Sequence, residues 1–450
     1  MASSSRQEQD IRAAGPPFDN SAADTVLQSS DGVQFHVHSI IVAEASEVFA
    51  GMFTIPLPPL QPGVDSSSSS SDPDVSADGR PVARLEEDSR TLDSLLRLCY
   101  PVPDPQLGDP AEVQRVLAAA MKYQMEEATA LMHNALSALL PGRALEVWAA
   151  ACSLRLDPDA DDAAFEMCAG PDPVVLPARA PPLLEEVTAG EYFRLSKYLA
   201  RSGQVDDGFC FWRADPARDT VADPMRERWA RREYKTVEFQ ERPFGDIVCR
   251  SSDGKELLSH KAVLATVSPV LRERILALDA SQTAPSDSQA PSSQVEGSSA
   301  RPVLEFDEPH HVLSAVLELC YPVRRSRWHD LALPLHDVCA FACAARKYEM
   351  DFVLQLIDAV FSQEHYPDPL RAFLLASRAG LTEYARTAER LVLRRERTPL
   401  EYGWYPEMET VPASAYHELC MKYADLRDSG GRLLSLKRKR PRTLAAGEEL

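Results

Sequence analysis

Two stretches of the chain share one order of apolar and polar positions, which predicts two short strands followed by two helices. In Asp24–Phe49 a β-branched and apolar run stops at Ser-Ser-Asp-Gly, and Phe35 and Val37 then alternate with polar residues. Such alternation is typical of a half-buried strand, and Asp-Gly is a hairpin signal because glycine supplies the positive φ that the turn needs. A short apolar helix, Ile40–Ala43, follows, and Ser46 is placed to cap a second helix.

The second stretch, Asp246–Leu271, aligns with the first without a gap, and ten of the 26 residue pairs are identical. Its short helix covers Ala262–Leu264. Ser268-Pro269 has the residue types of an N-cap followed by proline at the first helical position. Because the repeat is far longer than a solenoid unit, we expect each copy to be a domain.

The correspondence continues in the same order after each stretch. One helix ends in LLRLCYPV (Leu95–Val102) or VLELCYPV (Val316–Val323), and the next reaches AMKYQM (Ala120–Met125) or ARKYEM (Ala345–Met350). Apolar residues recur in these helices at i, i+3, i+4 and i+7, the spacing of one buried helix face. More weakly, helical segments at 144–155 and 370–378 and aromatic helices at 191–199 and 415–423 also correspond.

These patterns predict an α+β chain with two similar domains. Each domain carries a low-complexity insertion rich in serine and proline, at 56–81 and at 279–300. We interpret both insertions as surface loops, because the repeat resumes after each of them. The expected order is a disordered N-terminus (1–20), a first domain (21–140), a helical extension (141–200), a linker (201–241), a second domain (242–361), a second helical extension (362–428) and a basic disordered tail (429–450).

Composition limits the classes of function. The 450 residues are 44% hydrophobic, enough for the cores of two or three domains, and the net charge of −20 repels nucleic-acid phosphate. We therefore expect no direct binding of nucleic acid. No signal peptide and no apolar run of membrane-spanning length is recognisable, so we expect no membrane association. The nine cysteines form no C-x-x-C pair, which favours reduced thiols in the cytoplasm or the nucleus.

Candidate chemical sites are weak. His36 and His38 have a spacing that metals can use, but the second copy has Leu258 opposite His36, which favours structural histidines. Cys339 and Cys343 lack a second ligand pair with zinc spacing. The run 157–162 opens like a calcium loop without its glycine, and we interpret it as a solvated acidic loop. With no phosphate loop and no nucleophile elbow either, we expect no enzyme, no cofactor and no metal.

The repeated motifs resemble those of the BTB/POZ domain family. The same features occur in the same order in both copies. They are an apolar residue, Ser-Ser-Asp-Gly, a histidine six positions later, the short helix, the capped helix, the Tyr-Pro helix end and the Lys-Tyr-x-Met box. The chain is thus similar to the tandem BTB proteins common in fungi. This resemblance implies a small sheet flanked by helical hairpins. It also implies protein–protein contact, with pairing inside the chain, with a second copy or with other BTB proteins.

The resemblance also implies a charged pocket near the dimer interface of the family. An aspartate at the first strand and a basic residue after the strand-end histidine line this pocket. The matching residues are Asp246, His260 and Lys261 in the second copy. The first copy has Asp24 and His38, but a serine replaces the basic residue. The alternative interpretation is an ion pair that only supports the scaffold.

Three functions remain open at this point. The leading one is a non-enzymatic scaffold or adaptor in the cytoplasm, the nucleus or both. Many BTB proteins carry substrates to cullin-type ubiquitin ligases, but the apolar–x–Glu motif typical of such adaptors is missing from segments 51–59 and 272–281. The third is a nuclear transcription co-regulator. It rests on a tail that resembles a nuclear-import signal and contains Lys437, Arg438, Lys439, Arg440 and Arg442.

Overall fold

The computed structural model describes residues 11–54, 80–169, 176–206, 208–220, 239, 242–283, 301–321, 335–361 and 368–428. These residues divide into two compact units. The first unit runs to residue 187 and includes 191–214, and the second comprises 188–190 and the described residues from 215 to 428. The division after residue 214 falls inside the linker expected at 201–241.

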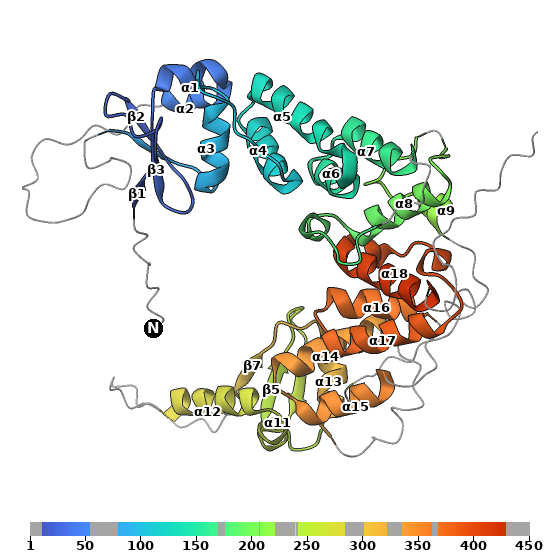
Figure 1. The fold of residues 1–450 in the computed structure, drawn as a ribbon. Helices are drawn as coiled ribbons and strands as arrows, with labels where there is room; N and C mark the ends of the chain where they lie inside the picture. The colour runs from blue at the N-terminus through green and yellow to red at the C-terminus, as the bar shows by residue number, and fades with distance from the viewer. Residues whose placement is uncertain are drawn as a thin grey trace, which may run out of the picture. The chain divides into compact units, whose positions relative to one another are not determined.

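The first unit opens with a four-stranded sheet in the order β1-β3-β2-β4 (Figure 1). β2 and β3 form the antiparallel hairpin that the alternation predicts, with Leu27 opposite Phe35. Gly32 at its turn has a φ of 85°, which a glycine adopts without strain. β1 pairs in parallel with β3, and β4 pairs in parallel with β2. The strands are β1 (Arg12–Ala13), β2 (Thr25–Gln28), β3 (Val33–Val37) and β4 (Val82–Arg84).

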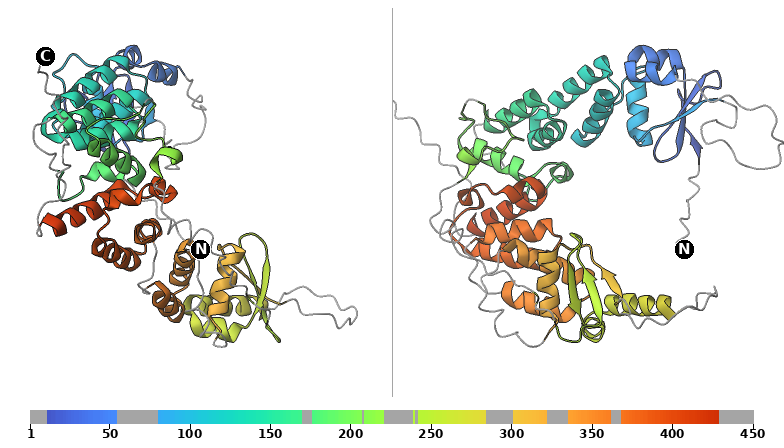
Figure 2. Two further views of the ribbon diagram at one scale, coloured as in Figure 1. Left: turned by 90° about the vertical axis from the view of Figure 1, so that its right-hand side faces the viewer. Right: turned by 180° about the vertical axis from the view of Figure 1, so that it is seen from behind.

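Within the first unit, α3 lies next to the sheet, and α4 to α7 extend away from it (Figures 1 and 2). α6 is kinked where Pro141–Arg143 depart from helical φ and ψ, and the boundary expected after residue 140 falls at this kink. The helices are α1 (Ser39–Ala45), α2 (Glu47–Phe53), α3 (Ser89–Arg97), α4 (Pro110–Lys122), α5 (Glu126–Ala138), α6 (Leu140–Leu154), α7 (Asp157–Ala169), the 3-10 helix η1 (Pro182–Glu185) and α8 (Ala189–Ala200).

The second unit repeats this arrangement with a three-stranded sheet in the order β6-β5-β7. β5 and β6 form the hairpin, with Cys249 opposite Leu257, and β7 pairs in parallel with β5 as β4 does with β2. Gly254, the counterpart of Gly32, has a φ of 78°. The α+β class is therefore confirmed.

The strands of this unit are β5 (Ile247–Arg250), β6 (Glu256–Ser259) and β7 (Val303–Glu305). Its helices are α9 (Pro216–Asp219), α11 (Lys261–Val267), α12 (Pro269–Thr283), α13 (His310–Leu319), α14 (Leu335–Lys347), α15 (Asp351–Phe361), α16 (Pro369–Arg378), α17 (Thr382–Arg394), η3 (Pro399–Tyr402), η4 (Pro406–Thr410) and α18 (Ala413–Asp428). Among the described helices, none has both the length and the apolar composition that crossing a membrane requires.

Both predicted N-caps are confirmed. Ser46 Oγ accepts the N–H of Phe49 at 3.1 Å and donates to the carbonyl of Tyr123 at 2.5 Å. Ser268 makes the same pair of bonds, at 3.0 Å to the N–H of Leu271 and at 2.5 Å to the carbonyl of Tyr348. Each serine therefore starts one helix and ties it to the Lys-Tyr-x-Met box.

The structure differs from the sequence-based expectation at the N-terminus. Residues 11–20 were expected to be disordered, but they include β1, and the Phe18 side chain is fully buried. The Phe18 ring meets that of Tyr100 edge-on, with 5.3 Å between centroids. Burial of this ring anchors a segment whose polar, small-residue composition gave no sign of order.

The acidic run at 157–162 was also expected to be a solvated loop, and this prediction was wrong. It forms the first turns of α7. Pro158 lies at the start, where its missing N–H costs no hydrogen bond, and acidic side chains at a helix N-terminus are favoured by the helix dipole. Ala160, Ala163 and Ala164 on the same helix are buried, so tertiary packing fixes it.

Two expected boundaries shift as well. In the linker, Phe211 is buried against Trp148, with ring centroids 5.8 Å apart, so this part packs on the first unit. In the second domain, α12 continues to Thr283, past the expected start of the insertion at 279. The rest of both insertions, apart from the residues around β4, lies outside the described residues, as does the tail 429–450.

Candidate interaction site

A polar corner forms in the first unit where β3 ends and α1 begins. Asp24 accepts two hydrogen bonds from Ser39, one from its N–H at 2.7 Å and one from its hydroxyl at 2.5 Å. The N–H of His38 donates to the hydroxyl of Tyr100 at 2.8 Å. Burial raises the pKa of Asp24, but the hydrogen bonds from Ser39 outweigh it and hold the pKa below its usual value. The carboxylate is thus held by Ser39 where the family pattern has a basic residue.

The second unit has the same corner where β6 ends and α11 begins. Asp246 accepts the backbone N–H of Lys261 at 2.7 Å, while the Lys261 ammonium pairs with Asp279 at 2.6 Å. The N–H of His260 donates to the hydroxyl of Tyr321 at 3.1 Å. The structure therefore brings Asp246 and Lys261 together through the backbone and directs the lysine charge to α12.

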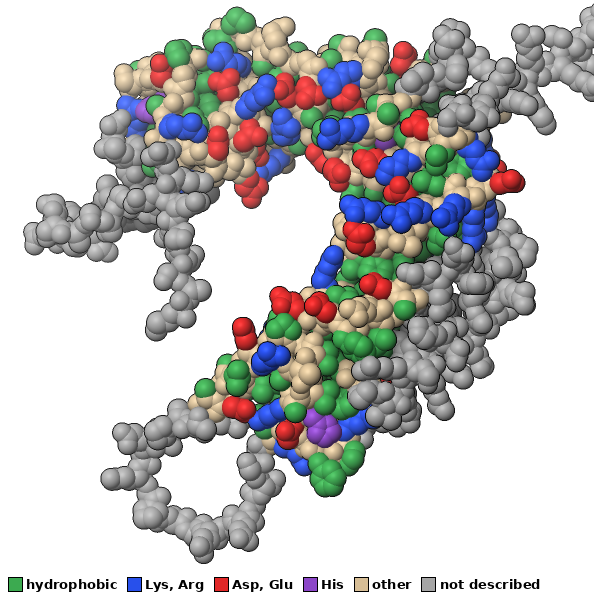
Figure 3. Space-filling view, turned by 60° about the horizontal axis from the view of Figure 1, so that its bottom comes forward, with side chains coloured by type: hydrophobic (Ala, Val, Ile, Leu, Met, Phe, Trp, Pro, Cys, Tyr) green, Lys and Arg blue, Asp and Glu red, His purple; other side chains and the backbone are tan. Residues whose placement is uncertain are grey.

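Each corner has an exposed large apolar residue near it in the sequence. Ile40 follows Ser39 on α1 and is 77% exposed, and Phe244, two residues before Asp246, is 95% exposed. If a partner covers such a side chain, the apolar part gains by losing water while neighbouring polar groups fix the geometry of the contact. On the face that Figure 3 shows, acidic and basic side chains are interspersed, so no single charge dominates there.

A second repeated cluster surrounds the Lys-Tyr pair at the end of α4. Lys122 Nζ lies 2.9 Å from carboxylate oxygens of both Glu86 and Glu87, and the hydroxyl of Tyr123 donates to Glu87 at 2.6 Å. In the second unit, Lys347 pairs with Asp307 at 2.7 Å and with Glu308 at 2.8 Å, and Tyr348 donates to Glu308 at 2.6 Å. The sequence marked the Lys-Tyr pair as a landmark without a role. Its partners are the two consecutive acidic residues that follow β4 in the first unit and β7 in the second. Their shared position in the two copies is the sequence signal that could have identified them.

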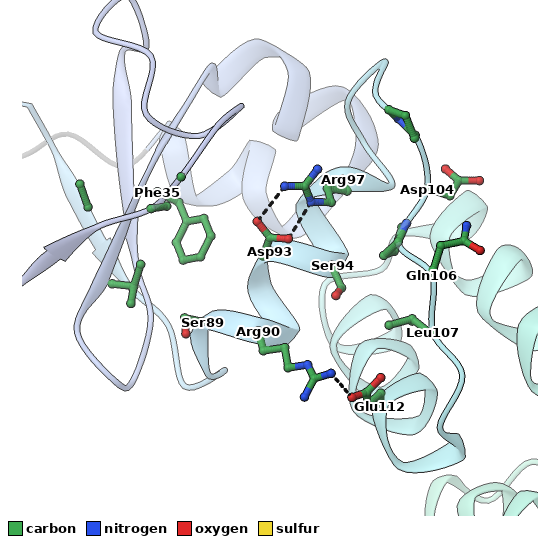
Figure 4. A pocket seen from close by; sticks show the side chains of 16 residues that line it. Phe35, Ser89, Arg90, Asp93, Ser94, Arg97, Asp104, Gln106, Leu107 and Glu112 are labelled. Atoms are coloured by element: carbon green, nitrogen blue, oxygen red, sulfur yellow. Dashed lines mark hydrogen bonds and ion pairs between the residues drawn. The ribbon is translucent and has the colours of Figure 1, made fainter.

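A groove of about 700 Å³ lies in the first unit beside β1, β3, α3 and the segment 103–107 (Figure 4). Phe35 contributes to its lining, and the charged side chains of Arg97 and Asp93 pair at 2.6 Å. Arg90 forms an ion pair with Glu112 across the groove. These four charges therefore neutralise each other in pairs. Sequence reasoning missed this groove because its lining comes from several separate segments.

The weak metal candidates have other contacts. His36 Nδ1 lies 2.8 Å from the guanidinium of Arg80, and Cys343 Sγ contacts the carbonyl of Ala379 at 3.6 Å. Within the described part of the chain, no three potential ligands come together as a metal site.

The corner and the sheet with its flanking helices can be compared with known proteins. A search of curated proteins gives no match for the chain. The match to protein families covers β2 to β4, helices α1 to α5 and the corner of the first unit, and leaves out β1. Residues 17–139 match the family model of the BTB/POZ domain, a protein–protein interaction module.

Proposed function

We propose that the chain is a non-enzymatic scaffold or adaptor that acts through two BTB/POZ domains. The first is the matched segment, and the second comprises the described residues between 242 and 361. The observation that carries the second assignment is the repeated hydrogen bonding. The two units share hairpin register, both serine caps, the tyrosine at the corner and the Lys-Tyr cluster.

The two corners are the proposed pairing surfaces, within the chain or between chains. Asp24 and His38 form one, and Asp246, His260 and Lys261 form the other, with Ile40 and Phe244 as their apolar anchors. A few well-packed side chains at the centre of an interface carry most of its binding energy. A charge placed at either anchor should therefore weaken pairing strongly.

The test compares Ile40→Glu and Phe244→Glu in the full chain, by light scattering for mass and by chemical cross-linking for contacts. The control is Phe165→Glu, because Phe165 is 64% exposed on α7, away from the corner residues in the sequence. Loss of a dimer in the two anchor variants supports pairing between chains. If the chain is a monomer with or without the substitutions, and the anchor variants lose the cross-links between the two units, the result supports pairing within the chain. Anchor variants that behave like Phe165→Glu contradict the proposal.

A cullin adaptor is the alternative that the family resemblance raises. The discriminating experiment is purification of the tagged protein from its native cells, followed by mass spectrometry. A stoichiometric cullin supports the adaptor function, and the proteins captured with it become candidate substrates. Capture of a second copy or of another BTB protein without a cullin supports a scaffold that acts by assembly.

A nuclear co-regulator is motivated by the basic tail, which lies outside the described residues. Lys437–Arg442 would be read as an import signal, because import receptors bind short exposed basic clusters. Deletion of these six residues should move a fluorescent fusion from the nucleus to the cytoplasm. An unchanged distribution rules out the signal and leaves the location as cytoplasmic, nuclear or both.

A further inference from the structure

The helix pairs α6–α7 and α16–α17 have the same local geometry in the two units (Figure 1). A residue between the two helices is left-handed in each pair, with a φ of 61° at Arg155 and of 66° at Gly380. The next N–H, that of Leu156 or Leu381, donates at 2.9 Å to the carbonyl five residues earlier. This correspondence aligns α7 with α17 residue by residue.

The aligned helices also bury the same positions. Ala163 and Met167 of α7 are buried, and so are Ala388 and Val392, the aligned residues of α17. Packing of each helix on its neighbour, α6 or α16, therefore uses equivalent apolar side chains. The exposed positions can differ between the two helices without changing the fold, because surface substitutions usually have little effect on stability.

The exposed positions of the two helices differ in charge. α7 contains five acidic residues and no basic one, whereas α17 contains Arg386, Arg390 and Arg394 at a spacing of four. These three arginines are exposed, and residues four apart lie on one side of a helix. At the aligned positions α7 has an aspartate, a phenylalanine and an alanine. The arginines are therefore a feature of α17 that this helix packing does not require.

The two glutamates of α17 leave the arginine stripe with an excess of positive charge. Arg386 pairs with Glu383 at 2.5 Å, but their side chains are 63% and 74% exposed, so the pair is worth little and can exchange for another carboxylate. Glu389 pairs with Lys422 of α18 at 3.1 Å. Leu393, next to the stripe, is half-buried and offers a small apolar contact.

The stripe matches a short acidic peptide in charge and size. A guanidinium binds a carboxylate through two parallel hydrogen bonds, which gives the contact direction as well as charge. From the first arginine to the third the helix rises by about 12 Å, the length of a few residues of peptide. A nucleic acid or an anionic membrane extends much further and is repelled by the net charge of −20 on the chain.

We infer that the face of α17 formed by Arg386, Arg390 and Arg394 binds a short carboxylate-rich segment of a partner protein. The inference is independent of the function proposed above, because it uses no residue of the two corners. It gives the second unit a binding surface that the aligned, acidic helix of the first unit cannot provide.

Fluorescence anisotropy of a labelled peptide of eight glutamates, added to the full chain, tests the inference. We expect binding that weakens as salt is raised, because exposed charges are screened. Arg390→Glu should weaken it about tenfold or more, since one attractive contact becomes repulsive. Arg390→Lys keeps the charge without the paired hydrogen bonds and should weaken it less. Arg115→Glu, at an exposed position of α4, is the matched control for net charge and should change the affinity less than about twofold. Circular dichroism verifies that each variant folds.

Several outcomes overturn the inference. Absence of binding, or equal binding of a peptide of eight glutamines, excludes recognition of carboxylates. Equal losses in Arg390→Glu and Arg115→Glu indicate general charge attraction. Tighter binding of a thymidine oligonucleotide that Arg390→Glu abolishes assigns the stripe to nucleic acid. Self-association without peptide that the same substitution abolishes, measured by light scattering, assigns it to a second copy of the chain.

Discussion

At the scale of single residues, Ser46 and Ser268 each make the same two hydrogen bonds. Each accepts a helix N–H and donates to a buried carbonyl, so its loss removes an N-cap and leaves a carbonyl without its donor. We expect Ser268→Ala to lower the free energy of unfolding of the second unit by about 2 kcal/mol. Urea denaturation measures the loss. Ser137→Ala, at an exposed position near the end of α5, is the control and should change the free energy by less than about 0.5 kcal/mol.

Glu87 makes the stability of the first unit depend on pH. Burial raises the pKa of this carboxyl, but hydrogen bonds from Tyr123 and Lys122 outweigh burial and lower the pKa below the ordinary value of 4.5. A carboxyl with a lowered folded pKa contributes stability that is fully present above its unfolded pKa. That stability is lost as the pH falls through the folded value. The contribution of Glu87 should therefore disappear progressively below about pH 4.5.

Glu87→Gln tests this contribution. At pH 7 we expect a loss of about 1–3 kcal/mol, because a hydrogen-bonded charge is removed from a site where the side chain is 10% exposed. The difference from the unmodified chain should shrink toward pH 3 in urea titrations. Glu86→Gln is the matched control, since the Glu86 side chain is 89% exposed and its ion pair is worth little. Equal effects of the two variants would contradict the assigned role of Glu87.

At the scale of elements, local patterns were sufficient where neighbouring residues determine the structure. The two hairpins, the two serine caps and the amphipathic helices that end at the Tyr-Pro and Lys-Tyr-x-Met motifs follow from alternation, Asp-Gly, Ser-Pro and apolar spacing, and these were predicted. β1 was not predicted, because its two residues lack alternation and become a strand only beside the edge of β3. α7 was missed because its proline and aspartates are typical of a loop, whereas its alanines are buried by packing on the preceding helix α6. The groove of Figure 4 and the partners of the Lys-Tyr pair were missed because the residues that form them come from segments far apart in the sequence.

The position of α2 depends on a stack of aromatic rings. Phe49 is fully buried, and its ring stacks on that of Tyr123 at 4.5 Å. We expect Phe49→Ala to lower the free energy of unfolding by about 3–5 kcal/mol, because it leaves a cavity between α2 and the end of α4. Met121→Ala is the control, since Met121 is 40% exposed and its loss opens no cavity. Thermal unfolding followed by circular dichroism compares the stability of the two variants.

At the scale of the whole molecule, three buried cysteines report on the packing of the second unit. All nine cysteines of the chain are free in the structure, and burial raises the pKa of Cys249, Cys320 and Cys339 to about 12. Since the thiolate is the reactive form, these three should react with a maleimide at pH 8 much more slowly than an unfolded thiol. Differential alkylation followed by mass spectrometry identifies each site. Fast labelling of all three in the folded chain would contradict the burial.

Two chain segments, from α2 to β4 and from α12 to β7, each join a helix to a parallel strand. Their length can change at little cost in stability. In each case the helix and the strand, and not the chain between them, fix where the connection starts and ends. Because the entropy of closing a loop grows slowly, doubling its length costs only about 0.6 kcal/mol. The two units can therefore differ at these points in length and composition while their cores stay alike. An engineer could use the same two points to insert a reporter protein.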